Sequence, residues 1–161
     1  MISLIRCDDR LIHGQCVVRV LSDFKIHHIV VIDDFVAGNS VLKSIFMMAA
    51  PEGIKTDIFT TEEAGGHLQA YAVAPEAVLL LMKSPETALA LFTRCAALKK
   101  ELNIGPISNR PNTKKATMYC YLTPEETEAI QQLDALGVRV YFNQVTDQPT
   151  VEWKDMAGSL L

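Results

Sequence analysis

The sequence lacks the features that mark several large classes of protein. No apolar run approaches the roughly 20 residues that span a bilayer, and the charges at Arg6 and Asp8 interrupt any candidate apolar segment of a signal peptide. Cations are fewer than anions, 15 against 19, for a net charge of −4. This balance argues against a nucleic-acid or anionic-membrane surface. We therefore expect a soluble, cytosolic protein with no nucleic-acid partner.

Motifs for metals and nucleotides are also missing. The four cysteines form no CxxC pair, and neither they nor the four histidines have the short spacings of a zinc site. No GxxxxGK[ST] loop occurs, and Gly65-Gly66 lacks the spaced glycines of a dinucleotide loop. We expect free, buried thiols at Cys7, Cys16, Cys95 and Cys120. The sequence indicates no metal and no other cofactor.

What is present is a regular alternation of apolar runs with helical patterns. At 161 residues and 49% hydrophobic composition, the chain has the size and core of one domain, which we assign to residues 1–161. Short buried runs followed by amphipathic segments predict an α/β fold: a mainly parallel sheet of about seven strands, with helices on both faces. Strands are expected at residues 2–6, 28–32, 55–59, 77–82, 101–104, 116–122 and 138–142.

Helix starts are indicated by capping residues. Helices are expected over residues 15–24, from Asn39 or Ser40, from Thr61 with its early acids, over 84–98 and from Thr123-Pro124. One further short helix is expected in the last twelve residues. The sequence contains no repeat, linker or low-complexity segment.

The stretch from Arg6 to Gln15 places two acids, two guanidinium groups and an imidazole between a buried strand and a helix. Loops at the carboxyl ends of parallel strands carry the chemistry of such folds. Asp33-Asp34 follows the second strand and should face the same crevice. The sequence therefore predicts a functional site at this edge of the sheet.

These residue types suit an anionic group. His13 can act as a nucleophile, Arg10 can pair with phosphoryl oxygens through its planar fork, and Gly14 allows close backbone approach at a helix N-terminus. Asp8 or Asp9 can orient Arg10 or hold one imidazole nitrogen, leaving the other free to attack. The sequence does not decide between the two acids.

Other readings of these residues carry less weight. Cys16 lies three residues after His13, but no third residue is apparent to orient a Cys–His pair. A receiver-type phosphoacceptor domain would use Asp8-Asp9 for Mg²⁺, but it needs an aspartate after the third strand, where this chain has Thr60-Thr61. His27-His28 precedes a strand at the opposite edge, which favours a structural role.

At this loop the sequence resembles a known family. The segment from Asp8 to Gln15 matches the DDRLIHGQ signature of the IIB components of the mannose/fructose/sorbose class of the bacterial sugar phosphotransferase system. The likeness continues in residues 30–37, 48–55 and 102–105 and in Lys114-Lys115, and it is looser after Thr123. It covers nearly the whole chain.

The resemblance implies a phosphocarrier. His13 would receive a phosphoryl group from a phosphorylated IIA partner through Nδ1 and pass it to a sugar bound by the membrane IIC/IID permease, with which the protein would associate peripherally in the cytoplasm. Arg10 would stabilise the phosphoryl group, with Asp8 and Asp9 beside it. Gly14, Gln15, Arg6 and Asp34 would complete the phosphate-binding site. Members often self-associate, so a homodimer is compatible with the resemblance.

The chain departs from the family pattern at Cys16, at Val18-Arg19-Val20 and at residues 106–109, positions expected to border the crevice and to affect partner docking. A contrasting reading is a regulatory module that binds phosphotransferase partners without carrying phosphate. An acid-labile phosphoryl group on the chain distinguishes the two.

Overall fold

The computed structural model describes residues 1–160, with the side chains of Gln15 and Cys16 left out. Its main feature is a seven-stranded sheet with the strand order β3-β2-β4-β1-β5-β8-β9. Neighbouring strands are parallel except β8 and β9. The strands are β1 (Ile2–Cys7), β2 (His28–Ile32), β3 (Lys55–Phe59), β4 (Val78–Met82), β5 (Glu101–Ile104), β8 (Arg139–Phe142) and β9 (Val151–Glu152).

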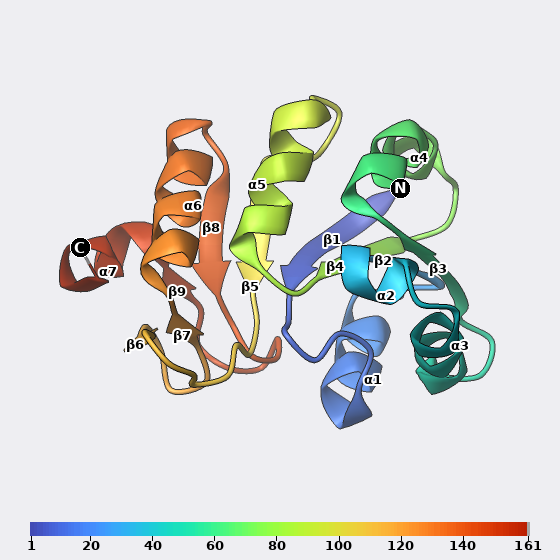
Figure 1. Ribbon diagram of the computed structural model, residues 1–161, viewed down its shortest axis with the longest axis horizontal. Coiled ribbons are helices and arrows are strands. Elements are labelled where there is room, and N and C mark those ends of the chain that lie inside the picture. The colour runs from blue at the N-terminus through green and yellow to red at the C-terminus, as the bar shows by residue number, and fades with distance from the viewer. Residues whose placement is uncertain (161) are drawn as a thin grey trace.

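Two hydrophobic layers, one on each face of the sheet, hold the helices in place. The side chains of Ile5, Cys7 and Leu80 belong to the layer under α4 (Thr61–Val73), α5 (Pro85–Arg94), α6 (Pro124–Ala135) and α7 (Trp153–Leu160). Leu4 and Leu79 point the other way, under α1 (Gly14–Asp23), α2 (Asp34–Ala37) and α3 (Ser40–Ala49). This alternation follows from the two-residue period of a strand. The expected fold class, with helices on both faces, is confirmed, and Figure 1 shows α4, α5 and α6 in a row across the molecule.

The capping signals located the helix starts well. Asn39 caps α3 and accepts a hydrogen bond from the Leu42 amide at 3.0 Å. Thr60 and Thr123 form capping boxes with the glutamates three residues later, at the starts of α4 and α6. Ser84 caps α5, which carries proline at its first position. No described helix is long and apolar enough to cross a membrane.

The sequence-based expectation is wrong for the segment before α6. A strand was expected over residues 116–122, but the structure has a small separate antiparallel pair, β6 (Lys114–Lys115) and β7 (Tyr121–Leu122). The apolar pattern arises because Cys120 and Leu122 join the core from this hairpin. The seventh strand of the sheet is β9 instead, which lies antiparallel to β8 just before α7. The short helix α2 after β2 was also not predicted.

Candidate functional site

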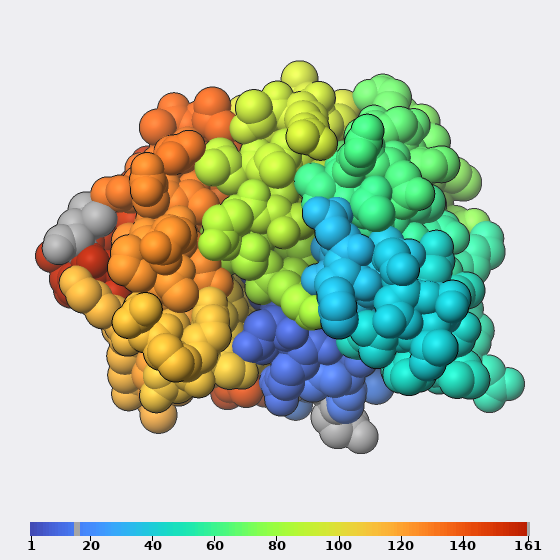
Figure 2. All heavy atoms as spheres, viewed as in Figure 1, coloured from blue at the N-terminus to red at the C-terminus, as the bar shows by residue number. Residues whose placement is uncertain are grey.

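The loop between β1 and α1 lies at the carboxyl ends of the central strands. The Asp8 amide donates to the Met82 carbonyl at the end of β4, at 2.9 Å, and the Asp9 amide donates to the Pro106 carbonyl after β5, at 3.2 Å. The order β4-β1-β5 thus holds the loop from both sides. In Figure 2 the blue N-terminal segment reaches the surface between the yellow residues that follow β5 and the cyan residues of α2 and α3.

Asp8 organises the turn from beneath. Its side chain is 3% exposed, and its Oδ1 accepts a hydrogen bond from the Arg10 amide at 3.2 Å. The same oxygen lies 3.9 Å from Arg10 Nε and 3.8 Å from His13 Nδ1. Burial raises the pKa of the Asp8 carboxyl above its ordinary value, and the Arg6 and His13 charges oppose this rise only in part. Of the two acids that the sequence left open, Asp8 is therefore the one beside His13 and Arg10.

His13 is the N-cap residue of α1, and its side chain is 22% exposed. Nδ1 lies 2.9 Å from the Leu11 carbonyl oxygen, which can only accept, so Nδ1 carries the hydrogen in this arrangement. Nε2 is buried and has no hydrogen-bond partner among the side chains and backbone that the structure describes. Attack through Nδ1 therefore requires the ring to leave Leu11, for example by a half turn that exchanges Nδ1 with Cδ2.

Two backbone positions with positive φ shape this loop. Leu11 has a φ of 56° although its side chain is only 1% exposed, and Gly14 has a φ of 46° at the first position of α1. Glycine at position 14 avoids the backbone strain that a Cβ would bring at this positive φ. Arg10 extends from the loop with 49% of its side chain exposed. The expected contributions of Gln15 and Cys16 concern side chains outside the described residues.

Asp9 points away from the imidazole. Its Oδ2 accepts a hydrogen bond from the Ser108 amide at 2.7 Å, while Oδ1 is buried and has no partner within the described part of the chain. Asp9 thus fastens the loop to residues 106–108, part of a segment that was expected from the sequence to differ from the family pattern. The expectation that these residues border the site agrees with this contact.

Arg6 was expected to help bind phosphate, but its guanidinium lies beneath the loop. It is 3% exposed and donates to Asn103 Oδ1, to the Asn143 carbonyl at 3.1 Å and to the Gln144 carbonyl at 2.8 Å. Its Nη2 is also 3.5 Å from Asp8 Oδ2. The structure therefore does not present Arg6 to a phosphoryl group at the surface.

Asp34 is at the expected edge of the sheet but belongs to a different contact. Its Oδ1 accepts a hydrogen bond from the Thr61 amide at the start of α4, at 2.6 Å. The strand β4 separates β2 from β1, so the two loops are two strand spacings apart, roughly 10 Å. Its neighbour Asp33 caps α2 and lies 3.3 Å from Lys83 Nζ, just after β4. The structure does not bring Asp34 to the imidazole.

The other histidines considered in the sequence, and the cysteines that the structure describes, lie away from this loop or are buried as free thiols. His28 lies at the opposite edge, where its Nε2 is 2.8 Å from Asp57 Oδ2, and His67 stacks on Phe59. Cys7 and Cys120 are buried free thiols, and Cys95 is a half-buried one. Among the described residues, no three metal-binding side chains lie together.

Fold and loop together define a class of protein. It is an open, mainly parallel α/β domain that presents a partly exposed imidazole, a buried carboxylate and an exposed guanidinium at the ends of its central strands. These three side chains together can accept a negatively charged group from a partner and pass it on. The imidazole supplies a lone pair for the new bond, and the guanidinium stabilises the negative charge.

The chain belongs to the family of PTS system sorbose subfamily IIB components, whose family model matches residues 2–160. It is therefore a IIB component of the sorbose/mannose class of the sugar phosphotransferase system. IIB components of this system are phosphotransferases in general. The resemblance carried by the loop and the later segments is confirmed.

Individual relatives support this assignment over the full length. The sorbose-specific EIIB component of Klebsiella pneumoniae is 30% identical over 154 residues, covering 96% of this chain and 93% of that protein. The mannose-specific EIIAB component of Escherichia coli (strain K12) is 25% identical over 160 residues, but this chain spans only 49% of its length. The solved IIBSor domain of the sorbose permease from Klebsiella pneumoniae superposes with a TM-score of 0.91 at 29% identity, covering 100% of this chain and 98% of that one.

Proposed function

We propose that this chain is a phosphocarrier that accepts a phosphoryl group on His13 from a phosphorylated IIA protein or domain. The group then passes to a sugar bound by the membrane IIC/IID permease, with the protein working at the cytoplasmic side. The observation that carries the proposal is the position of His13: partly exposed at the start of α1, with the Asp8 carboxylate 3.8 Å from Nδ1. A relative whose name combines IIA and IIB, the EIIAB component of Escherichia coli, supports a IIA partner.

Each transfer exchanges one bond to phosphorus for another. In the first, Nδ1 of neutral His13 forms a bond to phosphorus while the phosphorus–nitrogen bond of the IIA phosphohistidine breaks. In the second, a sugar hydroxyl oxygen bonds to the phosphorus, the bond to Nδ1 breaks, and the hydroxyl proton leaves to a base or to water. No metal or nucleotide enters either step.

The surrounding groups fit these steps. Arg10 is exposed and can reach the phosphoryl oxygens as a planar fork. Asp8 carries negative charge close to Nδ1, which favours any positive charge that develops on the ring. The proton on Nδ1 and its bond to Leu11 must be given up before attack. We therefore expect ring reorientation to precede phosphorylation.

Reconstitution tests the proposal. The chain is incubated with phosphoenolpyruvate, enzyme I, the histidine phosphocarrier and a IIA protein of this class, and its intact mass is measured. We expect one acid-labile, base-stable phosphoryl group on the wild type and none on His13→Ala. The matched control is His27→Ala, an exposed histidine at the opposite edge of the sheet, which should be phosphorylated normally.

A second pair of variants tests the cation. Arg10→Ala should slow transfer by about 100-fold, the usual cost of losing one charge-stabilising donor. Arg139→Ala removes an equally exposed guanidinium from the start of β8 and should leave the rate unchanged. NMR couplings between ³¹P and ¹⁵N should identify Nδ1 as the phosphorylated atom. Normal phosphorylation of His13→Ala would refute the proposal, and an unphosphorylated wild type beside a working IIB control would favour the regulatory module.

A further inference from the structure

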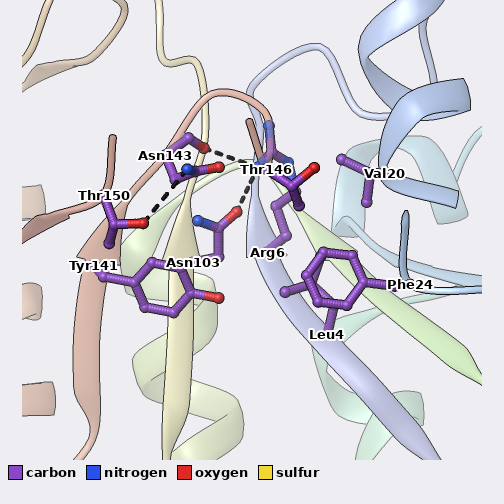
Figure 3. A pocket seen from close by; sticks show the side chains of 9 residues that line it. All are labelled: Leu4, Arg6, Val20, Phe24, Asn103, Tyr141, Asn143, Thr146 and Thr150. Carbon is purple, nitrogen blue, oxygen red and sulfur yellow. Dashed lines mark hydrogen bonds between the residues drawn. The ribbon is translucent and has the colours of Figure 1, made fainter. Parts of the chain in front are cut away.

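Arg6 connects the ends of three neighbouring strands beneath the site. It leaves β1 on the face that carries α1, and its guanidinium donates to Asn103 on β5 and to the carbonyls of Asn143 and Gln144 after β8. Figure 3 shows the contacts with Asn103 and Asn143 at the wall of a cavity of about 160 Å³. A guanidinium suits this position because its donors are fixed in one plane and can serve several acceptors at once.

Gly105 has no room for a side chain because of Arg6. A Cβ on Gly105 would lie 2.5 Å from Cζ and 2.9 Å from Nε of Arg6, closer than real Cβ contacts. The φ of Gly105 is not in the left-handed region, so its backbone conformation does not require glycine. Its amide donates to the Cys7 carbonyl at 2.8 Å, which fixes it against β1. The missing Cβ therefore makes space for the guanidinium.

A short path leads from Arg6 to the imidazole. Arg6 Nη2 lies 3.5 Å from Asp8 Oδ2, and the other carboxylate oxygen accepts the Arg10 amide and faces His13 Nδ1 at 3.8 Å. The Asp8 carboxylate is thus held at one oxygen by the Arg10 amide and at the other by the buried guanidinium of Arg6. Displacing Arg6 should therefore change how Asp8 faces His13.

We infer that Arg6 is a positioning residue for phosphoryl transfer at His13, that it acts by orienting Asp8, and that Gly105 admits it. The inference rests on the proposed function of His13. It gives Arg6 a role different from contact with the phosphoryl group itself.

The main test displaces Arg6 without changing any side chain of the site. Gly105→Ala should lower the single-turnover rate of transfer from phosphorylated IIA by about 10- to 100-fold, because ångström-scale misplacement costs that much. Its apparent affinity for IIA should be unchanged. Gly65→Ala is the matched control: it adds the same Cβ inside α4, where nothing lies within 4 Å, and should react at the wild-type rate.

Arg6→Met, Asp8→Asn and the double variant test the route through Asp8. If Arg6 acts by orienting Asp8, then Arg6→Met should cost a large rate factor in the wild type and little in an Asp8→Asn background. Equal rate losses in both backgrounds would refute the route. Asn103→Ala removes one acceptor of Arg6 without adding bulk. It takes the place of Gly105→Ala or Arg6→Met if either of these variants fails to fold.

The ¹⁵N resonances of the His13 ring give a readout that does not depend on transfer. They should shift in Gly105→Ala and Asn103→Ala but not in Gly65→Ala. Unchanged resonances, together with rate losses that only follow the loss of folded protein, would overturn the inference. An unphosphorylated wild type would instead refute the proposed function, and the ring resonances would still report whether Arg6 positions His13.

Discussion

Leu11 offers a direct test of how the site loop is held, because two opposing effects meet at one residue. Its backbone adopts a φ of 56°, which costs a residue with a Cβ about 1–2 kcal/mol. Its side chain is 1% exposed, and losing such a side chain costs about 2–5 kcal/mol. The packing therefore holds the strained backbone, and with it the carbonyl that accepts His13 Nδ1.

Comparison of alanine with glycine at this position separates the two effects. Both substitutions remove the packing, but only glycine removes the strain. Glycine ordinarily costs about 0.4–1 kcal/mol relative to alanine, through the freedom it adds to the unfolded chain. At Leu11 the strain of about 1–2 kcal/mol opposes this cost. We expect Leu11→Gly to be as stable as Leu11→Ala or up to about 1.6 kcal/mol more stable.

The neighbouring residue provides the control. Ile12 is 3% exposed and its φ is not positive. Ile12→Ala should therefore have a higher unfolding free energy than Ile12→Gly, which is the usual order. Urea unfolding of the four variants can be followed by the fluorescence of Trp153, the single tryptophan of the chain, which is buried. The glycine-minus-alanine difference in unfolding free energy should be about 1–2 kcal/mol more favourable at position 11 than at position 12. Equal differences at the two positions would refute the reasoning.

Three further predictions concern stability. Burial raises the pKa of Asp8, so the folded state holds this proton more tightly than the unfolded state, and the stability of the wild type relative to Asp8→Asn should fall as the pH rises above 3.8. Urea titrations from about pH 3 to about pH 7 measure this difference, and a constant value would contradict the prediction. Leu80→Ala, in the centre of the sheet, should lower the unfolding free energy by about 2–5 kcal/mol in the same assay. Thr60→Ala removes the cap of α4 and should cost about 1 kcal/mol, whereas Thr61→Ala, one position into the helix, should cost clearly less.

The sequence predicted most strands and helices because their signals are local. A run such as residues 29–32, which are all isoleucine or valine, is typical of a strand buried on both faces, and the structure has a strand at His28–Ile32. Residues 116–122 gave a similar apolar signal for another reason: their apolar side chains reach the core from a hairpin outside the sheet. Composition alone does not separate these cases, because both bury the same kinds of side chain.

The site shows the same limit more sharply. Local spacing placed His13, Arg10 and Asp8 in one loop, and the structure brings them together. The local spacing could not show that Arg6 turns inward, because the oxygens that bind its guanidinium lie up to 138 residues further along the chain. The role of Asp9 was likewise decided by a residue far along the chain, Ser108 in the segment after β5.

The central place of β1 has a consequence for synthesis of the protein. This strand precedes the other strands of the sheet in the chain, yet its neighbours in the sheet are residues 78–82 and 101–104, and Arg6 finds its carbonyl partners only at residues 143 and 144. At about 5–20 residues per second, a ribosome needs on the order of ten seconds to reach them. For that time the apolar strand and the buried arginine of the nascent chain lack their native partners. The strand of the sheet that is translated before the others is thus among the last to be completed.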